Sequence, residues 1–227
     1  MGVGRGRAPR PAVDLEAGAP PGAERCPACG EPLFAWLETE GWGPREDQIV
    51  DRCENCGLVI PRGGSSSPEA AGDELLGAAP ARSNGGGRES AMRAANAASL
   101  QAWLGAENWA ALRPGASSLA PTPRAVELLC ERRGLSVAGI RHLVAPGIAS
   151  MWQTLLNLLT FHRDFATEAA SGRLRPGTGR GRAAYGIDVV VTVLAAIPTA
   201  ILAAVLEGCA VLARRGGVIE VRVRPAP

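Results

Sequence analysis

The chain has 227 residues, and its 24 basic and 22 acidic side chains give a formal net charge of +2 at pH 7. A charge this close to neutral argues neither for nor against a nucleic-acid partner. Only two histidines are present, and neither neighbours a plausible nucleophile, which excludes a convincing Ser/His/Asp arrangement. All basic residues are arginine, and alanine, glycine and proline are abundant. This composition indicates a GC-rich coding bias, so arginine clusters are discounted as evidence of phosphate recognition.

Residues 1–24 combine glycine, proline, arginine and alanine without a periodic apolar pattern, and we expect a disordered tail here. The run Gly4-Arg5-Gly6-Arg7 would suit a nucleic-acid contact, but a short disordered tail is the better account of it. The segment lacks the continuous apolar region of a secretory signal. We therefore expect the protein to be cytoplasmic.

Two Cys-x-x-Cys-Gly sequences dominate residues 25–62, which we expect to form a zinc ribbon. The residues concerned are Cys26, Cys29 and Gly30, then Cys53, Cys56 and Gly57. Each pair makes a tight turn that aims two thiolates at one point, and the following glycine can adopt a positive φ. Four converging thiolates are a preferred ligand set for structural Zn²⁺. The alternatives are two disulfides or unpaired thiols. The strain of a disulfide within a Cys-x-x-Cys pair argues against the first alternative, and so does the lack of a signal that would place the chain in an oxidising compartment.

The stretch between the two cysteine pairs predicts a hairpin with strands at 34–38 and 48–52 and a turn at 41–44. After this ribbon, residues 63–88 turn to serine, glycine, alanine and proline, which predicts a flexible linker. The ribbon itself is acidic, which makes nucleic acid an unlikely partner of its surface. Its acidic residues are Glu31, Glu38, Glu40, Glu46 and Asp47.

Regular structure is predicted to resume in residues 89–149. Apolar spacing over 89–104 indicates one or two short helices, and no strand is expected between residues 63 and 95. Thr122 followed by Pro123 predicts the N-cap and first position of a helix that ends before Gly134. Residues 135–144 then alternate enough to form a strand.

Residues 150–216 hold two long apolar segments, followed by a terminal strand and tail over 217–227. Ser150-x-x-Gln153 resembles a capping box and predicts an amphipathic helix from 150 to about 172. Its polar face would carry a solvated or capping His162. Two lone cysteines in apolar runs, Cys130 and Cys209, are expected to be small buried hydrophobes.

Residues 189–206 carry no charge, and this length lies at the lower threshold for a membrane helix. Arginines flank both ends, whereas a simple span prefers its positive residues on one side. We therefore favour a membrane-surface or re-entrant helix, and keep a single transmembrane helix and a purely soluble helix as alternatives. Pro198 at the centre of this segment would kink the helix or divide it into two short limbs.

The chain resembles class I S-adenosylmethionine-dependent methyltransferases that begin with a zinc ribbon. The resemblance is carried by three patterns: Arg52-Cys53-Glu54-Asn55-Cys56-Gly57-Leu58, Asn96-x-x-Ser99-Leu100 with Leu104-Gly105-x-x-x-Trp109 and Leu112-x-Pro114, and Thr122-Pro123-Arg124-x-x-x-Leu128-Leu129-x-x-x-Gly134-Leu135. It implies an α+β or partial α/β fold, a zinc ribbon joined to the C-terminal part of a Rossmann-like domain with long apolar helices. The strand after Gly134 would be the sixth of the sheet, and residues 217–223 the antiparallel seventh.

In that family the cofactor unit stands between the ribbon and the Asn-x-x-Ser-Leu pattern, and its glycine-rich loop has no counterpart in residues 63–95 here. We therefore expect a degenerate, non-catalytic, membrane-associated binding or accessory module with structural Zn²⁺ and no catalytic or cofactor-binding residues of its own. The alternative is a methyltransferase, or a fragment of one, whose S-adenosylmethionine site comes from a partner chain or from a lost central segment.

Overall fold

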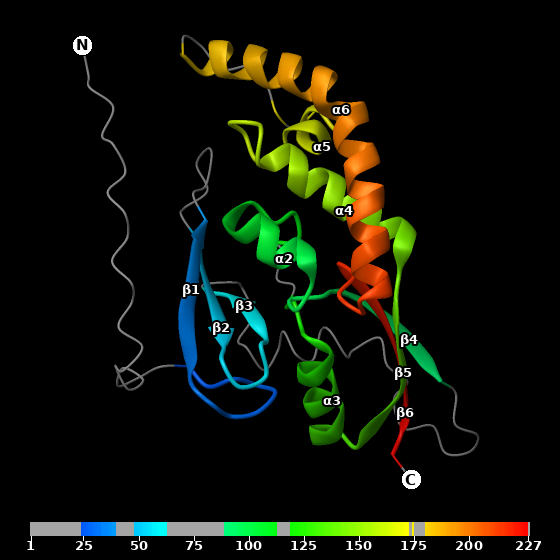
Figure 1. Ribbon diagram of the computed structural model, residues 1–227. Coiled ribbons are helices and arrows are strands. Elements are labelled where there is room, and N and C mark those ends of the chain that lie inside the picture. The colour runs from blue at the N-terminus through cyan, green and yellow to red at the C-terminus, as the bar shows by residue number, and fades with distance from the viewer. Residues whose placement is uncertain are drawn as a thin grey trace.

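The computed structural model describes residues 24–39, 48–62, 89–112, 119–172, 174 and 180–226 (Figure 1). The predicted tail up to residue 23, the hairpin turn at 41–44 and the linker over 63–88 lie outside these residues. The described part is a mixed α/β structure with two small antiparallel sheets and a cluster of cysteines.

The first sheet has the order β1-β2-β3 and belongs to the cysteine-containing segment. Its strands are β1 (Leu33–Thr39), β2 (Gln48–Cys53) and β3 (Val59–Pro61). Phe34 lies opposite Arg52 in the antiparallel β1–β2 ladder, which confirms the predicted hairpin strands to within a residue or so. The buried carboxylate of Asp51 accepts a hydrogen bond from Arg62 Nε at 2.9 Å, so the charge that β2 buries is paired.

The second sheet has the order β4-β6-β5, with the last strand of the chain between the other two and antiparallel to both. These strands are β4 (Ser90–Ala95), β5 (Leu135–His142) and β6 (Val218–Pro225). The predicted antiparallel pairing of 217–223 with the strand after Gly134 is confirmed. Ile219, Val221 and Val223 of β6 are fully buried, as expected for the inner face of a central strand.

The prediction of a helix beginning at residue 89 is wrong for its first part. The prediction that no strand occurs before residue 96 is also wrong. Met92 and Ala94 are buried in β4 while their neighbours Ala91 and Arg93 are exposed, which is the two-residue period of a strand. Small residues blurred that pattern, and the partner strand lies more than 120 residues further along. The helical part is confirmed only as α2 (Leu100–Gly105), which the Ser99 side chain caps, and a 3₁₀ turn η1 (Ala106–Asn108) follows it.

The helix at Thr122–Pro123 is confirmed as α3 (Pro123–Arg132). Thr122 accepts a hydrogen bond from Ala125 N at 3.1 Å as its N-cap, and Gly134 has the positive φ of 65° that ends the helix before β5. The chain therefore passes from cap to helix to glycine to strand in the predicted order.

The helix predicted from Ser150 to about residue 172 is wrong at its start and in its continuity, whereas its end near Gly172 is confirmed. The structure has α4 (Val144–Asn157) and a separate α5 (Phe165–Ala170). No side chain caps α4, because it begins directly where β5 leaves the sheet, with Leu143 N donating to Val218 O at 2.9 Å. Asp164 at a φ of 54° breaks the helical path between the two helices.

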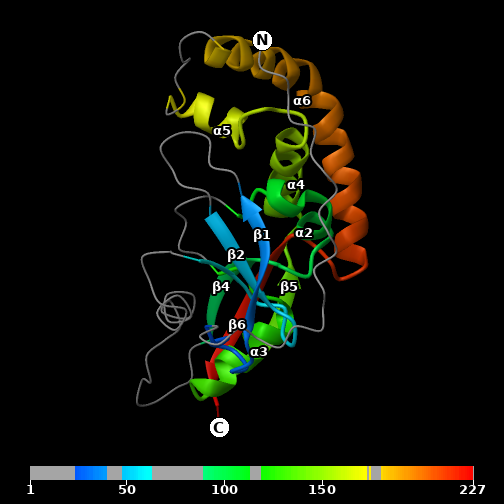
Figure 2. The ribbon, with the colours of Figure 1, turned by 90° about the vertical axis from the view of Figure 1, so that its left-hand side faces the viewer.

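The 33-residue α6 (Arg180–Leu212) packs along α4 and leads back to β6, so α4, α5 and α6 form one insertion between two neighbouring strands. Figures 1 and 2 show α6 bent around α4 and α5, with the outer side of the bend facing away from the rest of the molecule. Pro198 lies within the helix and accounts for a bend, because its ring removes one backbone hydrogen bond.

One buried apolar cluster joins the cysteine segment to the second sheet. Leu58 beside the second knuckle, Val126 of α3 and Val221 of β6 are all members of it. Val59 and Ala120 also form a bridge between the two regions, with both N–H···O distances at 3.0 Å. The cysteine-containing segment and the second sheet therefore bury each other's apolar surface.

Candidate metal centre

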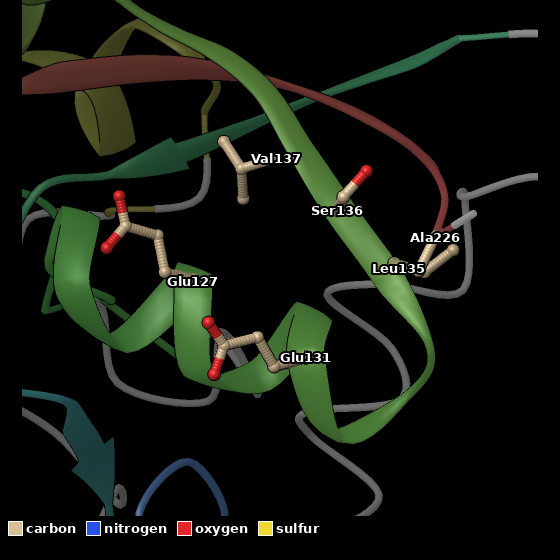
Figure 3. A pocket seen from close by; sticks show the side chains of 6 residues that line it. All are labelled: Glu127, Glu131, Leu135, Ser136, Val137 and Ala226. Atoms are coloured by element: carbon tan, nitrogen blue, oxygen red, sulfur yellow. The ribbon is translucent and has the colours of Figure 1, made fainter.

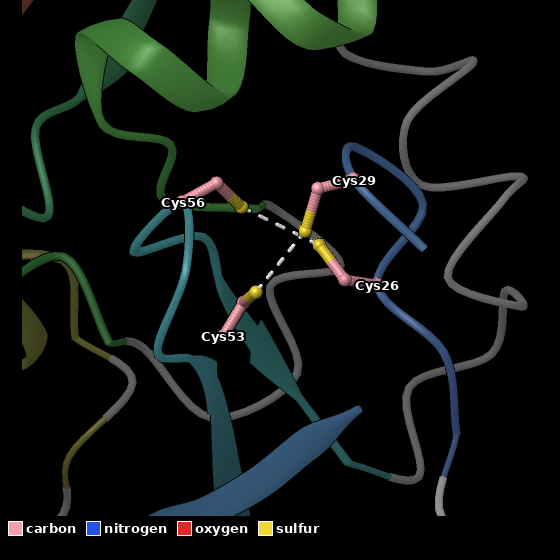
Figure 4. A group of neighbouring side chains, drawn as sticks. All are labelled: Cys26, Cys29, Cys53 and Cys56. Carbon is pink, nitrogen blue, oxygen red and sulfur yellow. Dashed lines mark hydrogen bonds between the residues drawn. The ribbon is translucent and has the colours of Figure 1, made fainter. Parts of the chain in front are cut away.

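The structure brings the four predicted ligand cysteines together. Their sulfur atoms all lie within 4.8 Å of one another, with Cys26 Sγ 3.5 Å from Cys56 Sγ and Cys29 Sγ 3.4 Å from Cys53 Sγ. Figure 4 shows the sulfurs entering one small space from two separate loops. All four are free thiols, so the disulfide alternative is not what the structure holds.

The two knuckles repeat the same backbone arrangement. In the first, Gly30 N donates to Cys26 O at 2.8 Å and Cys26 N donates to Glu31 O at 2.8 Å. In the second, Gly57 N donates to Cys53 O at 2.8 Å and Cys53 N donates to Leu58 O at 2.9 Å. Gly30 and Gly57 have φ values of 82° and 73°, which confirms the reason given for a glycine after each pair.

Helix α3 supports both knuckles from one side. The Thr122 hydroxyl donates to Cys56 O, and Arg132 Nη1 donates to Pro27 O at 2.9 Å. A Cβ atom on Gly57 would lie 2.7 Å from Thr122 Cγ2, so only glycine allows this approach. The cap of α3 is thus also a contact of the cysteine cluster.

Protons are shared unequally among the sulfurs. A hydrogen bond from the Cys56 thiol lowers the pKa of Cys26 to about 5, and the same contact with Cys26 raises the pKa of Cys56 above its ordinary value. Burial raises the pKa of Cys53. The protein alone therefore does not hold four thiolates together, and a bound cation is the group that would do so.

The arrangement fits a tetrahedral metal ion. Four sulfurs at about 2.3 Å from one ion would be about 3.8 Å apart, which lies inside the observed range of separations. Four protein ligands fill such a shell and leave no position for a substrate or an activated water. The chemistry available here is that of a structural site.

The remaining two cysteines differ from each other. Cys130 is buried, as predicted, and burial raises the pKa of its thiol to about 11. Cys209 is exposed on α6, so its prediction as a buried hydrophobe is wrong. The reason is that α6 turns that side of the helix away from the protein.

A cavity of about 430 Å³ lies between α3 and β5 (Figure 3). Its lining residues are Glu127, Glu131, Leu135, Ser136, Val137 and Ala226. Glu127 and Glu131 stand one turn apart on the exposed side of α3, where solvated carboxylates are ordinary. None of the predicted metal ligands lies here.

Several polar residues that the sequence placed at the surface are buried instead. His162 was expected to be a solvated or capping residue, yet it is buried, and its Nδ1 lies 2.6 Å from Asp188 Oδ2. Gln153 and Asn157 of α4 are also buried, with Gln153 Nε2 donating to Asn157 Oδ1 at 2.9 Å. The signal that could have revealed them is the pair of acids at both ends of an otherwise uncharged segment, Asp188 and Glu207.

The predicted apolar segment forms part of a helix that is long and apolar enough to cross a membrane by length and composition. This segment of α6, Gly181–Leu212, contains an 18-residue stretch with a mean hydropathy of 2.6, and only 11% of that stretch is buried in the protein. A core helix of a soluble protein can share the same length and composition, but a core helix is mostly buried. Helix α6 can therefore span or anchor at a membrane.

Comparison of the chain with protein-family models, with curated proteins and with solved structures finds no match. The case for function therefore rests on the cysteine cluster, the apolar helix and the residues that hold them.

Proposed function

We propose that this protein is a non-catalytic, membrane-associated accessory module built on a structural zinc ribbon. The observation that carries the zinc assignment is the convergence of four free thiols, two from each of two knuckles with the same backbone hydrogen bonds. Zn²⁺ prefers this ligand set and this spacing, and its role would be to hold the two knuckles together. The cluster also lies against α3, so the ion would stabilise the junction with the second sheet.

The membrane association rests on the exposed apolar side of α6. An apolar surface of this size, left open on a folded protein, is typical of a membrane or protein interaction site.

Descent from the methyltransferase family is supported by the positions of the residues that carry the resemblance. Asn96 Nδ2 donates to Gly216 O at 2.9 Å beside the start of β6, Ser99 caps α2, and Trp109 is fully buried. The antiparallel terminal strand beside β5 fits the same origin. These are roles in folding, and none of them requires the cofactor.

The second candidate function is a methyltransferase whose cofactor site comes from a partner chain. One observation favours it: in the described part of the chain, β4 pairs only with β6, so its outer edge is open to another strand. A partner that supplied the glycine-rich unit would have a place to join the sheet there.

Two measurements on the purified full-length chain test the proposal. Metal analysis should return one zinc per chain, and flotation with vesicles of phosphatidylcholine and phosphatidylglycerol should carry the protein upward. Calorimetry with S-adenosylmethionine separates the two candidates, since the accessory module should give no heat of binding. Micromolar binding by this chain alone would overturn the non-catalytic assignment, and a zinc content well below one would overturn the structural metal.

A further inference from the structure

We propose that the outer side of α6 is a one-sided membrane-docking surface: the bent helix inserts the middle of its outer face into a single leaflet and does not cross the bilayer. This inference rests on the membrane association proposed above and goes further, because it assigns the lipid-contacting residues and the topology. The partner is a lipid bilayer with anionic head groups.

The outer face of α6 is a continuous apolar stripe. It comprises Ile187, Val190, Val193, Leu194, Ile197, Ile201, Leu202, Val205 and Leu212. Successive members are mostly three or four residues apart, which places them along one side of the helix. The most exposed members of its middle, Val193, Leu194 and Ile197, are 69–72% exposed. Apart from Leu212 at the C-terminal end, which is 87% exposed, the centre of the stripe is its least covered part.

The inner face of α6 is fixed to the protein near its N-terminal end by Asp188. This side chain is fully buried, and its carboxylate accepts hydrogen bonds from Phe161 N at 2.7 Å and His162 N at 2.9 Å. The same carboxylate lies 2.6 Å from His162 Nδ1. Asp188 thus binds the segment that connects α4 to α5, and Phe161 in that segment exposes an aromatic ring near this end of α6.

Near its C-terminal end, α6 is fixed by Glu207, which is also fully buried. Its Oε2 accepts a hydrogen bond from Gln101 Nε2 of α2 at 2.7 Å, and its Oε1 accepts one from Gly217 N at 2.8 Å. The carboxylate also lies directly over Gly147 of α4, where a Cβ atom would be 2.1 Å from Glu207 Oε1. This end is therefore held by α2, by α4 and by the residue just before β6.

These two attachments decide whether α6 docks on one face of the membrane or crosses it. Asp188 and Glu207 are 19 residues apart, about 28 Å of helix, which is close to the thickness of the hydrocarbon core of a bilayer. If α6 crossed the membrane alone, the two carboxylates would lie at opposite boundaries of that core. At least one of them would then lose the hydrogen-bond donors that it has on the protein body, and those buried donors would be left unpaired. With both ends bound to the protein body, only the outer face remains free for lipid.

The shape and charge of α6 agree with a one-sided insertion. Its bend is convex toward the outside, so the middle of the stripe projects furthest from the protein (Figures 1 and 2). Exposed arginines lie at the two ends, Arg182 at the first and Arg214 with Arg215 at the second. Anionic head groups complement positive charge at both edges of an inserted apolar segment.

The first test removes the apolar centre of the stripe. The triple variant Leu194→Ser, Ile197→Ser, Ile201→Ser should reduce flotation with phosphatidylcholine–phosphatidylglycerol vesicles by at least about tenfold. The matched control is Trp103→Ser, because Trp103 is 73% exposed on α2 and is not part of the stripe. The control should float as the unmodified protein does, and circular dichroism confirms that both variants are folded.

The second test determines whether the two ends of α6 lie on the same side of the membrane. Ala183→Cys and Ala213→Cys, each in a Cys209→Ala background, place a thiol just inside one end of α6 and just beyond the other. Each protein is synthesised in a cell-free system in the presence of sealed vesicles and is then treated with a membrane-impermeant maleimide. One-sided docking predicts that both positions are labelled from outside without detergent.

The outcomes separate this inference from the proposed function. Flotation of the unmodified protein with only one of the two positions labelled would overturn the one-sided topology and leave membrane association intact. Flotation of the triple variant at the unmodified level would overturn the assignment of the stripe alone. No flotation at all would overturn both, and a dimer in solution that the triple variant makes monomeric would then identify a second copy as the occupant.

Discussion

The cysteine cluster and the α4–α6 packing are both held by buried polar groups, but the sequence encodes them in opposite ways. Each half of the metal centre is a five-residue repeat whose turn and glycine are local. The attachments of α6 depend on Asp188 and Glu207, whose partners include residue 161, 27 positions from Asp188, and residue 101, 106 positions from Glu207. The metal centre can be predicted from the sequence because its pattern is local and repeated. The attachments of α6 cannot, because their partners are dispersed along the chain.

The two regions should also lose stability for different physical reasons. The cluster depends on an ion that binds the folded chain, so its stability is linked to free metal. The α6 attachments depend on shape, because glycines at 147 and 217 leave room for Glu207 and Gln101. The following substitutions separate these dependences, from the largest expected effect to the smallest.

Loss of one ligand should be the most damaging change. We expect Cys56→Ser to abolish stoichiometric zinc binding and to lower the free energy of unfolding by several kcal/mol, because zinc-binding energy is folding energy in small ribbons. Urea unfolding with and without a chelator measures this. Cys209→Ser is the control, since Cys209 is exposed and outside the cluster. Equal sensitivity of the two variants to chelator would contradict a structural ion at this site.

Adding one methyl group at the contact between α4 and α6 should destabilise the protein nearly as much as the loss of a metal ligand. In Gly147→Ala the new Cβ would lie 2.1 Å from Glu207 Oε1 and displace the carboxylate from its donors. We expect a loss of about 3 kcal/mol, from overpacking together with the broken hydrogen bonds. Thermal unfolding followed by circular dichroism gives the value.

The matched control for this change lies on α6 itself. A Cβ on Gly208 would meet nothing within 4 Å, so Gly208→Ala should stabilise the helix by up to about 1 kcal/mol. If both glycine variants changed stability by the same amount, the close approach of Glu207 to α4 would not contribute to the fold.

A third pair of variants isolates the contact between the ribbon and α3. Gly57 and Gly172 both have a positive φ, but only Gly57 faces another residue, with its Cβ position 2.7 Å from Thr122 Cγ2. Gly172→Ala should lose about 1 kcal/mol from the backbone alone, and Gly57→Ala about 1–2 kcal/mol more. Denaturant titration compares them directly, and identical losses would show that the ribbon does not rest on the α3 cap.

The last expected effect appears only at high pH and concerns Cys130. Burial raises the pKa of this thiol from 9.0 to about 11, so the folded protein favours the protonated form. Its contribution to stability is complete below pH 9 and is lost as the pH rises from 9 to 11. A Cys130→Ala variant should therefore lose less stability over that range than the unmodified protein.

Accessibility to a thiol reagent gives a second test of the burial of Cys130. At pH 8 iodoacetamide should modify the exposed Cys209 and leave the buried Cys130 intact, as peptide mass mapping would show. Rapid modification of Cys130 at this pH would contradict its burial.

The sequence predicted the features whose signal is local. The cysteine knuckles, the cap at Thr122, the turn at Gly134 and the two hairpin strands of the ribbon follow from neighbouring residues. Strand β4 was missed because its partner is β6, at the other end of the chain. Helix α4 was placed too late because it begins from a backbone contact with Val218 and not from a side-chain cap.

The candidate sites divide in the same way. The ligand set of the metal centre could be named from spacing alone, whereas Asp188 and Glu207 were read only as the charged limits of an apolar segment. Their burial follows from a fold in which α4 and α6 are inserted between two adjacent strands, and no local pattern contains that information. A charged residue at each end of an apolar helix therefore needs its partners identified before the helix is called a membrane span.

The claim that α6 is held on one side and open to lipid on the other is tested most directly by a depth measurement at its centre. A nitroxide attached to Ile197→Cys in the Cys209→Ala background should, on phosphatidylcholine–phosphatidylglycerol vesicles, become more accessible to oxygen than to a water-soluble nickel complex. Nitroxides at residues 183 and 213 should remain at head-group depth. A label at residue 197 that stays as water-exposed as the two ends would contradict the claim.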